Sequence, residues 1–319
     1  MAVSASQRFF ERLWYRPTVW WLWLFLPLQL LLRFVVWLRR SFYRVELFKS
    51  TKVDKPVVVI GNINVGGTGK TPLSIYLIEW LMAKGYKPGL VTRGYGGSCD
   101  SFPLLVLDET SAALCGDEPF LIYQRTRATV VVDPVRSRGA HKLVELGCDI
   151  ILCDDGLQHY ALQRDLEIAV VDGGRGLGNG WLMPMGPLRE PKSRLNDVDI
   201  IITNGQDMVL DPQPVKPLAH QEKIQKHSVY AVAAIGNPKR FFDTLKAEGY
   251  SVEAHSFPDH HKFSLSDFEG MQGPILMTEK DAVKCYPFAD NRMYYLPVNT
   301  VLNDSCAEAV QQKLLQLLR

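Results

Sequence analysis

The sequence predicts an α/β protein, in which a mostly parallel sheet carries helices on both faces. From residue 55 onward, short runs of β-branched residues alternate with helical stretches, as in strands joined by crossover helices. These runs are almost continuously apolar, which is typical of parallel strands buried on both faces. The chain has 319 residues, 47% of them apolar and 22% charged, which suits about two globular domains and argues against a disordered chain.

Residues 1–48 are predicted to form an apolar, membrane-associated helix. Four of the seven tryptophans lie between residues 20 and 37, in an apolar run long enough to cross a bilayer. Pro27, Gln29 and Arg33 interrupt this run, so a spanning helix and a helix lying at the headgroup level both remain open. A buried core helix is a further alternative. Arginines on both sides favour the interfacial position, because their long side chains reach the headgroups: Arg8, Arg12, Arg16, Arg39, Arg40 and Arg44.

Residues 49–220 are predicted to form a larger domain and residues 221–319 a smaller α/β domain. A stretch rich in Pro, Gln and Lys at 211–226 is expected to link them. The larger domain is expected to hold strands at 57–60, 90–92, 129–133, 149–154, 167–172 and 198–203. The smaller domain is expected to hold strands at 229–235, 251–257, 275–278 and 294–298, a helix from about Pro238 and a C-terminal helix from about Ser305.

Charge and cysteine usage limit the classes of function. Lys and Arg number 36 against 34 Asp and Glu, and this balance does not provide the broad basic surface that non-specific nucleic-acid binding requires. The six cysteines are scattered, without a Cys-x-x-Cys pair, which is typical of a reducing compartment. We therefore expect a cytoplasmic location for the part of the chain outside the membrane, and no nucleic-acid partner.

The segment 57–71 predicts a phosphate-binding loop between a strand and a helix. Its glycines let backbone N–H groups curl around one phosphate at the positive end of the helix dipole. In such P-loops the lysine, here Lys70, reaches the β- and γ-phosphates, and the hydroxyl of Thr71 holds Mg²⁺. Asn64 stands where the common pattern has its first glycine. The expected nucleotide-binding residues are Asn64, Val65, Gly66, Gly67, Thr68, Gly69, Lys70 and Thr71.

Acidic residues mark the ends of predicted elements. Asp154 and Asp155 end an apolar strand, where P-loop enzymes place a second metal-binding carboxylate. Only one of the two is expected to contact the metal, because successive strand residues point to opposite faces. Two carboxylates in the Gly-Asp-Glu-Pro turn at 116–119 precede a predicted helix, and helix capping is the alternative reading there. The Asn-Gly-Gln-Asp segment at 204–207 is expected to be a turn.

Three further loops carry polar side chains suited to chemistry. The loop at 92–97 holds Arg93 and Tyr95, although a plain turn is its alternative. Arg189 can stabilise charge on a transferring phosphoryl group, or form a solvated ion pair with the neighbouring Glu190. The segment 257–263 offers two adjacent histidines, and one of them, oriented by its neighbouring aspartate, suits proton transfer; a solvated loop is the alternative.

Taken in order, these motifs resemble the tetraacyldisaccharide 4′-kinase family, the lipid A 4′-kinases. The resemblance runs through nearly the whole chain, at 61–62, 65–72, 93–97, 116–119, 133–138, 154–159, 186–190, 259–260 and 278–281. It implies ATP- and Mg²⁺-dependent phosphorylation of the 4′-hydroxyl of a tetraacylated glucosamine disaccharide 1-phosphate. The implied location is the cytoplasmic face of a Gram-negative inner membrane, with peripheral attachment or a single N-terminal anchor.

The resemblance also implies a role for individual residues. Asp117 would accept the proton of the attacking hydroxyl with the help of His260, which matches the family motif better than His261 does. Lys70 and Arg189 would act on the transferring phosphoryl group, and the Thr68 hydroxyl would help to hold phosphates. Substrate contacts would come from Arg93, Tyr95 and Arg189, and metal contacts from Thr71, Glu118, Asp154 and Asp155.

The position of His260 beyond the expected linker implies that two domains close over ATP and sugar. The expected partners are the lipid substrate and the membrane surface, without an obligate protein partner. The alternative function is a membrane-associated P-loop ATPase that acts as a partitioning or targeting switch. Such switches usually carry a lysine where this chain has Val65.

Overall fold

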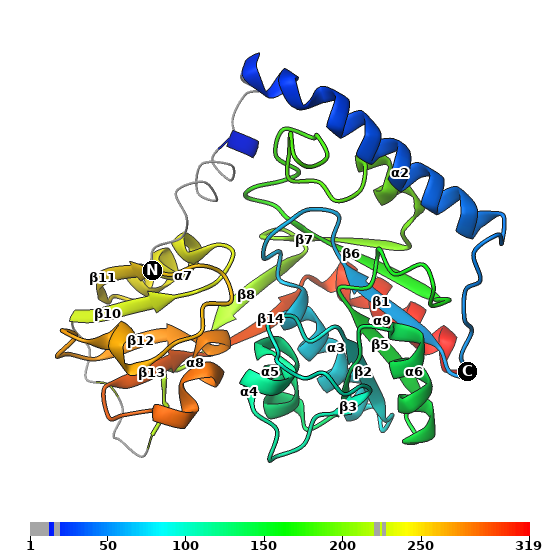
Figure 1. The fold of residues 1–319 in the computed structure, drawn as a ribbon. Helices are drawn as coiled ribbons and strands as arrows, with labels where there is room; N and C mark the ends of the chain where they lie inside the picture. The colour runs from blue at the N-terminus through cyan, green and yellow to red at the C-terminus, as the bar shows by residue number, and fades with distance from the viewer. Residues whose placement is uncertain (1–12, 16–19, 220–223, 225–227) are drawn as a thin grey trace.

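Two α/β domains form the body of the protein, with a long helix along one edge (Figure 1). The computed structural model describes residues 13–15, 20–219, 224 and 228–319. Among these residues the larger sheet has nine strands, in the order β14 (Val298–Leu302), β8 (Met208–Pro212), β7 (Ile200–Asn204), β6 (Leu166–Asp172), β1 (Val57–Gly61), β5 (Ile150–Asp154), β2 (Pro88–Thr92), β4 (Thr129–Val132) and β3 (Leu104–Leu105). The smaller sheet has five, in the order β11 (Ser251–Ser256), β10 (Ser228–Ala233), β12 (Ile275–Thr278), β13 (Met293–Leu296) and β9 (Lys216–Pro217).

The centre of the larger sheet is parallel from β7 through β6, β1, β5 and β2 to β4, which confirms the predicted fold class. Alternate residues of β1 enter the two apolar cores, with Val58 and Ile60 on one face and Val57 and Val59 on the other. The first face is covered by α3 (Lys70–Ala83), α4 (Ala112–Cys115), α5 (Asp117–Thr126) and α9 (Asp304–Leu317), and the second by α6 (Arg136–Glu145).

The smaller domain packs α7 (Pro238–Ala247) against one face of its sheet and α8 (Glu279–Cys285) against the other. Four of its strands, β11, β10, β12 and β13, run parallel. Short 3₁₀ helices complete the two domains: η2 (Lys192–Asp197), η3 (Leu265–Phe268) and η4 (Tyr286–Phe288).

The predicted division of the chain differs from the structure at its C-terminal end. The prediction assigned all of 221–319 to the smaller domain, but β14 pairs antiparallel with β8, and α9 joins the core of the larger domain. The predicted strand at 294–298 contains the end of β13 and the start of β14, and the predicted linker contains the end of β8 and all of β9. A local pattern does not identify the sheet that a strand joins, because that choice depends on distant partners. The boundary at 220/221 and the arginines at 8, 12 and 16 lie outside the described residues.

The N-terminal helix α2 (Leu26–Arg44), with the 3₁₀ turn η1 (Trp20–Phe25) before it, lies along the outside of the larger domain (Figure 1). Its inner side is held by the ion pair of Arg40 with Asp197, at 2.7 Å, and by the packing of Tyr43 on Tyr160. By length and composition the helical segment Trp20–Arg44 could cross a membrane. Only 11% of its most apolar stretch is buried, so the alternative of a buried core helix is wrong. Its outer side exposes Trp20, Trp23, Leu24, Leu28, Leu30, Leu31, Phe34, Val35 and Trp37.

Candidate active site

The phosphate loop joins the buried strand β1 to the N-terminus of α3, in the predicted order of strand, loop and helix. Gly66 and Gly69 have φ angles of +104° and +102°, a backbone region that a side chain disfavours. Gly69 is the residue that precedes the first turn of α3, and Lys70 begins that turn. The loop therefore turns its backbone over the positive end of the helix.

Two asparagines hold the loop in this shape. The Nδ2 of Asn62 donates to the Thr68 hydroxyl at 3.3 Å, and the Nδ2 of Asn204 donates to the Thr68 carbonyl at 2.9 Å. The Thr68 hydroxyl accepts from Asn62 and keeps its own O–H available as a donor. Asn64 is only 1% exposed, and neither polar atom of its side chain has a hydrogen-bond partner among the described residues.

The carboxylates at the end of β5 occupy different environments. Asp154 is 1% exposed, and its Oδ1 accepts a hydrogen bond from Ser74 at 3.3 Å, while its Oδ2 has no partner within the described part of the chain. Burial, together with the nearby charge of Glu118, raises the pKa of Asp154 to about 7. Asp155 turns outward to Lys70, whose Nζ lies 3.4 Å from Oδ1. Burial alone would raise the pKa of Asp155, but Lys70 and Arg189 hold it well below its usual range.

Arg189 is a partner of the phosphate loop and not of Glu190. Its two terminal nitrogens donate to the two carboxylate oxygens of Asp155, at 3.0 and 2.8 Å, and one of them also donates to the Asn62 side chain. Glu190 is buried and accepts hydrogen bonds from Gln158 and Tyr160. The alternative of a solvated Arg189–Glu190 ion pair is therefore wrong.

An aspartate and a histidine from different domains meet beside these groups. Asp117 is the first residue of α5, and the Nδ1 of His260 lies 3.0 Å from each of its carboxylate oxygens. His261 points elsewhere, because its Nε2 lies 3.2 Å from Asp267. Asp259, expected to orient a histidine, lies farther away, with its Oδ1 3.8 Å from the Nε2 of His260. The structure thus joins His260, and not His261, to Asp117.

Lysines of α8 surround the carboxylates of α5. Burial raises the pKa of Asp117, but the hydrogen bond with His260 and the charge of Lys280 outweigh it and lower that pKa to about 2. The Nζ of Lys280 lies 2.8 Å from Glu118 Oε1 and 3.3 Å from the Nε2 of His260. Burial lowers the pKa of Lys280, and the three neighbouring carboxylates raise it well above its usual range. Glu118, expected near the metal, is therefore already paired with a lysine.

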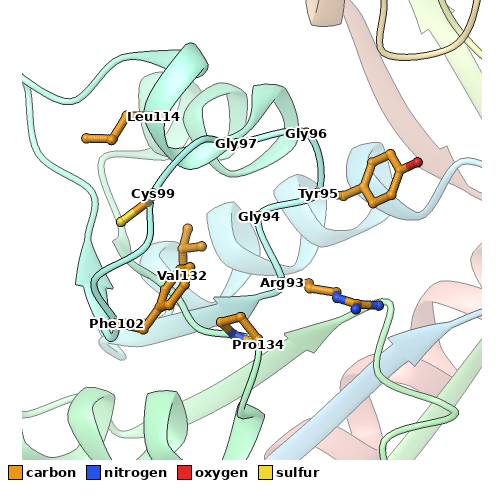
Figure 2. Close-up of a pocket in the computed structure, with 10 residues that line it drawn as sticks. All are labelled: Arg93, Gly94, Tyr95, Gly96, Gly97, Cys99, Phe102, Leu114, Val132 and Pro134. Atoms are coloured by element: carbon orange, nitrogen blue, oxygen red, sulfur yellow. The ribbon is translucent and has the colours of Figure 1, made fainter.

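The glycine-rich loop after β2 carries Arg93 and Tyr95. It lines a cavity of about 320 Å³, and Figure 2 shows both side chains pointing away from the wall made by Cys99, Phe102 and Leu114. The Tyr95 ring is 65% exposed and stands edge-on to the His260 imidazole, with 4.7 Å between the ring centroids. The structure thus brings Tyr95 to the aspartate–histidine pair.

Four residues at the domain interface had no predicted role in the site. Arg175 donates to the phosphate-loop carbonyl of Gly67 at 2.7 Å and to the carbonyl of Gly236, in the smaller domain, at 3.2 Å. Arg240 of α7 donates to Asn204 at 2.7 Å. Asn204 lay in a motif that we interpreted as a turn. No motif around Arg175 or Arg240 indicates a contact between the domains. Lys280 lies in a motif of the family resemblance, which gave it no role.

These groups together suit phosphoryl transfer to an alcohol. The helix N-terminus and Lys70 provide positive charge for phosphates, and the end of β5 provides a buried carboxylate oxygen for a cation. The paired Asp117 and His260 provide a base with an oriented hydrogen-bond donor.

Comparison with known proteins gives a consistent result. A family model described as Tetraacyldisaccharide-1-P 4′-kinase matches residues 21–316. The tetraacyldisaccharide 4′-kinase of Tolumonas auensis is 46% identical over 319 residues, covering 96% of this chain and 98% of that relative. That of Psychromonas ingrahamii is 48% identical over 299 residues, covering 90% and 93%. Among solved structures, the "apo" form of LpxK from Aquifex aeolicus in complex with ATP matches with a TM-score of 0.78 at 25% identity, covering 93% of this chain and 99% of that one.

Proposed function

The chain belongs to the tetraacyldisaccharide-1-phosphate 4′-kinase family, and on this premise we propose how its own residues carry out the reaction. It is an ATP-dependent kinase that phosphorylates the 4′-hydroxyl of tetraacyldisaccharide 1-phosphate in lipid A biosynthesis. The comparisons do not favour the switch ATPase. The observation that carries the residue assignments is the hydrogen bond between Asp117 and His260, which come from different domains.

The phosphates of ATP are proposed to lie on the loop 64–71. The N-terminus of α3 offers backbone N–H groups there, and the Lys70 ammonium is held at its first turn. Lys70 shares Asp155 with Arg189, so both cations stand at one carboxylate beside the loop. In this arrangement Arg189 and Lys70 are placed to balance charge that spreads over the transferring phosphoryl group.

The residues present fit a magnesium ion. Mg²⁺ is usually held by one or two carboxylates together with phosphates and waters, and Asp154 has a buried oxygen without a partner among the described residues. Asp154 and Thr71 are proposed to hold the ion, with Asp155 and Glu118 near it but engaged with cations. When bound, the ion would neutralise charge on the phosphates. In its ionised form Asp154 would provide a buried negative charge that favours a cation here.

Asp117 is proposed to accept the proton of the 4′-hydroxyl. As that O–H bond breaks, the sugar oxygen forms a bond to the γ-phosphorus, the bond from this phosphorus to the β,γ-bridging oxygen breaks, and ADP leaves. With a pKa of about 2, Asp117 is ionised at neutral pH. His260 donates to it and fixes its direction, and Tyr95 stands beside the pair. Tyr95 and Arg93, on the same loop, are proposed to contact the sugar lipid.

The N-terminal helix is proposed to bring the enzyme to its substrate at the cytoplasmic face of the inner membrane. Moving acyl chains out of a bilayer costs about 0.8 kcal/mol per CH₂, so a four-chain lipid favours catalysis at the membrane surface. The larger domain holds one side of α2 through Arg40 and Tyr43, and the opposite side is apolar and exposed. This arrangement supports a helix that lies in the interface.

The reaction is tested with detergent-solubilised protein, Mg·ATP and tetraacyldisaccharide 1-phosphate. Mass spectrometry should find one added phosphate on the distal sugar. The matched control is Lys70→Ala, which should lose nucleotide binding and transfer together. A rate of ATP hydrolysis that does not change when the lipid is added, without a phosphorylated lipid product, would contradict the kinase assignment and support the switch ATPase.

A further inference from the structure

We propose that Lys280 is a positioning residue of this reaction, which holds His260 as a hydrogen-bond donor to Asp117 and fastens the pair across the two domains. The proposal rests on the proposed roles of Asp117 and His260. Lys280 acts through these two residues, and its position is set by the first turn of α8.

The ammonium group of Lys280 lies at the centre of a charged cluster. Its Nζ is 2.8 Å from Glu118 Oε1, 3.8 Å from Asp117 Oδ2 and 3.7 Å from Asp259 Oδ1. It also lies 3.3 Å from the Nε2 of His260. The side chain is only 17% exposed, so these contacts are largely shielded from water. A cation that is mostly shielded from water and has three carboxylates around it is held firmly in place.

The chemistry of an ammonium group determines which ring nitrogen of His260 carries the proton. An ammonium has three N–H donors and no acceptor, so the contact with Nε2 is a hydrogen bond only if Nε2 offers a lone pair. The proton of a neutral ring is then on Nδ1, which faces both oxygens of Asp117 at 3.0 Å. An ionised carboxylate accepts only, so both contacts require the same tautomer. His260 thus donates to Asp117, and its one ring lone pair accepts from Lys280. Of the two residues, only Asp117 has lone pairs left to accept the hydroxyl proton.

The charge of Lys280 matters as well as its N–H groups. The groups facing His260 are the carboxylates of Asp117 and Asp259, the Lys280 ammonium and the edge of the Tyr95 ring. Without the ammonium, two carboxylates would favour a doubly protonated imidazolium ring. An imidazolium would donate more strongly to Asp117 and make it a weaker base. Burial lowers the pKa of His260, the hydrogen bond with Asp117 outweighs burial and raises it, and the charge of Lys280 opposes that rise and so favours the neutral ring.

The same lysine connects the two domains at the reacting groups. Lys280 and His260 belong to the smaller domain, whereas Asp117 and Glu118 begin α5 of the larger domain. His260 has a φ of +60°, a left-handed backbone region that is uncommon outside glycine, and contacts with neighbouring residues help to hold it there. The Lys280–Glu118 ion pair provides a support that spans the interface.

The kinetic test compares Lys280→Met with Lys280→Arg in the full-length, detergent-solubilised enzyme. We expect Lys280→Met to lower kcat by about 100-fold, because a misplaced catalytic group costs roughly that factor, with the KM for ATP within about twofold. Lys280→Arg keeps the positive charge and the donors and should recover much of kcat. The matched control is Lys262→Met, which removes an exposed lysine two residues from His260 and should leave kcat unchanged.

A spectroscopic readout separates this role from a merely structural one. In enzyme labelled with ¹⁵N-histidine, the His260 signals are identified by their loss in His260→Asn, and two-bond correlations report which ring nitrogen is protonated. We expect a proton on Nδ1 and a bare Nε2 in the wild type and in Lys280→Arg, and a protonated Nε2 in Lys280→Met. A protonated Nε2 in the wild type, or a bare Nε2 with unchanged kcat in Lys280→Met, would overturn the proposal.

Two measurements keep the outcome clear. If circular dichroism shows that Lys280→Met does not fold, Lys280→Gln replaces it, because glutamine retains a hydrogen-bond donor without the charge. The wild-type spectrum tests the tautomer without any variant. If Asp117→Asn keeps full activity, the proposed role of Asp117 fails, whereas the protonation of His260 still decides whether Lys280 sets the state of the ring.

Discussion

A double-mutant cycle on Asp117 and His260 tests whether the two residues act together in accepting the hydroxyl proton. Asp117→Asn removes the base and keeps the size of the side chain, so kcat should fall by about 10²- to 10⁴-fold, or about 3 to 5 kcal/mol of transition-state stabilisation. His260→Asn removes a hydrogen bond to a charged acceptor, worth about 1.5 to 3 kcal/mol, so kcat should fall by about 10- to 100-fold. The Nδ1 of His260 contacts Asp117 alone, at 3.0 Å from both oxygens. The double variant should therefore be no slower than Asp117→Asn.

The assay is the initial rate of phosphate transfer to the lipid at saturating ATP, with circular dichroism to confirm that each variant is folded. His261→Asn is the matched control, because this neighbouring histidine faces Asp267 within the smaller domain. Its kcat should stay within about threefold of the wild type. Losses that multiply in the double variant would show that His260 acts independently of Asp117 and would refute the reasoning.

Three further predictions follow from separate parts of the structure. In Gly236→Ala the new Cβ would lie 2.6 Å from the Gly67 amide nitrogen, so the KM for ATP should rise by about tenfold, whereas Gly273→Ala, with ordinary contacts only, should not change it. Burial and nearby arginines lower the pKa of His159 to about 4, so the unfolded chain binds this proton more readily than the folded protein does. Between pH 7.5 and 5 the free energy of unfolding in urea should therefore fall by about 1 to 2 kcal/mol more in the wild type than in His159→Gln. An equal pH dependence in the two proteins would contradict this. Changing three exposed apolar residues of α2, Leu28, Leu31 and Val35, to Gln should weaken vesicle binding by about 100-fold, near 3 kcal/mol of binding free energy, in a flotation assay. The same change at the equally exposed Leu265 is the control and should leave vesicle binding unchanged.

Local patterns determined the parts of the fold that depend on neighbours in the chain. The apolar runs predicted the central parallel strands, because a strand buried on both faces needs apolar residues at successive positions. The glycines before Lys70 predicted the phosphate loop, because a turn with positive φ angles and a helix N-terminus are both local features. The exposed apolar face of α2 was likewise visible in the tryptophans of that segment.

The composition of the site depended on contacts between distant residues. Asp117 and His260 are 143 positions apart, and nothing in the Asp-His-His segment indicates which imidazole faces the other domain. The Nδ1 of His260 faces Asp117, while Asp267 engages His261. A resemblance to a family could select His260, but the geometry that explains the choice is tertiary.

The sequence by itself determined the fold class, the phosphate loop and the apolar helix, because each follows from spacing and residue type within a short segment. Only the tertiary structure decided that β14 and α9 return to the larger sheet, and that Lys280 and Glu118 form an ion pair beside the aspartate–histidine pair. The physical reason is that hydrogen bonds and ion pairs depend on distances in space. Those distances are set when the two domains pack together.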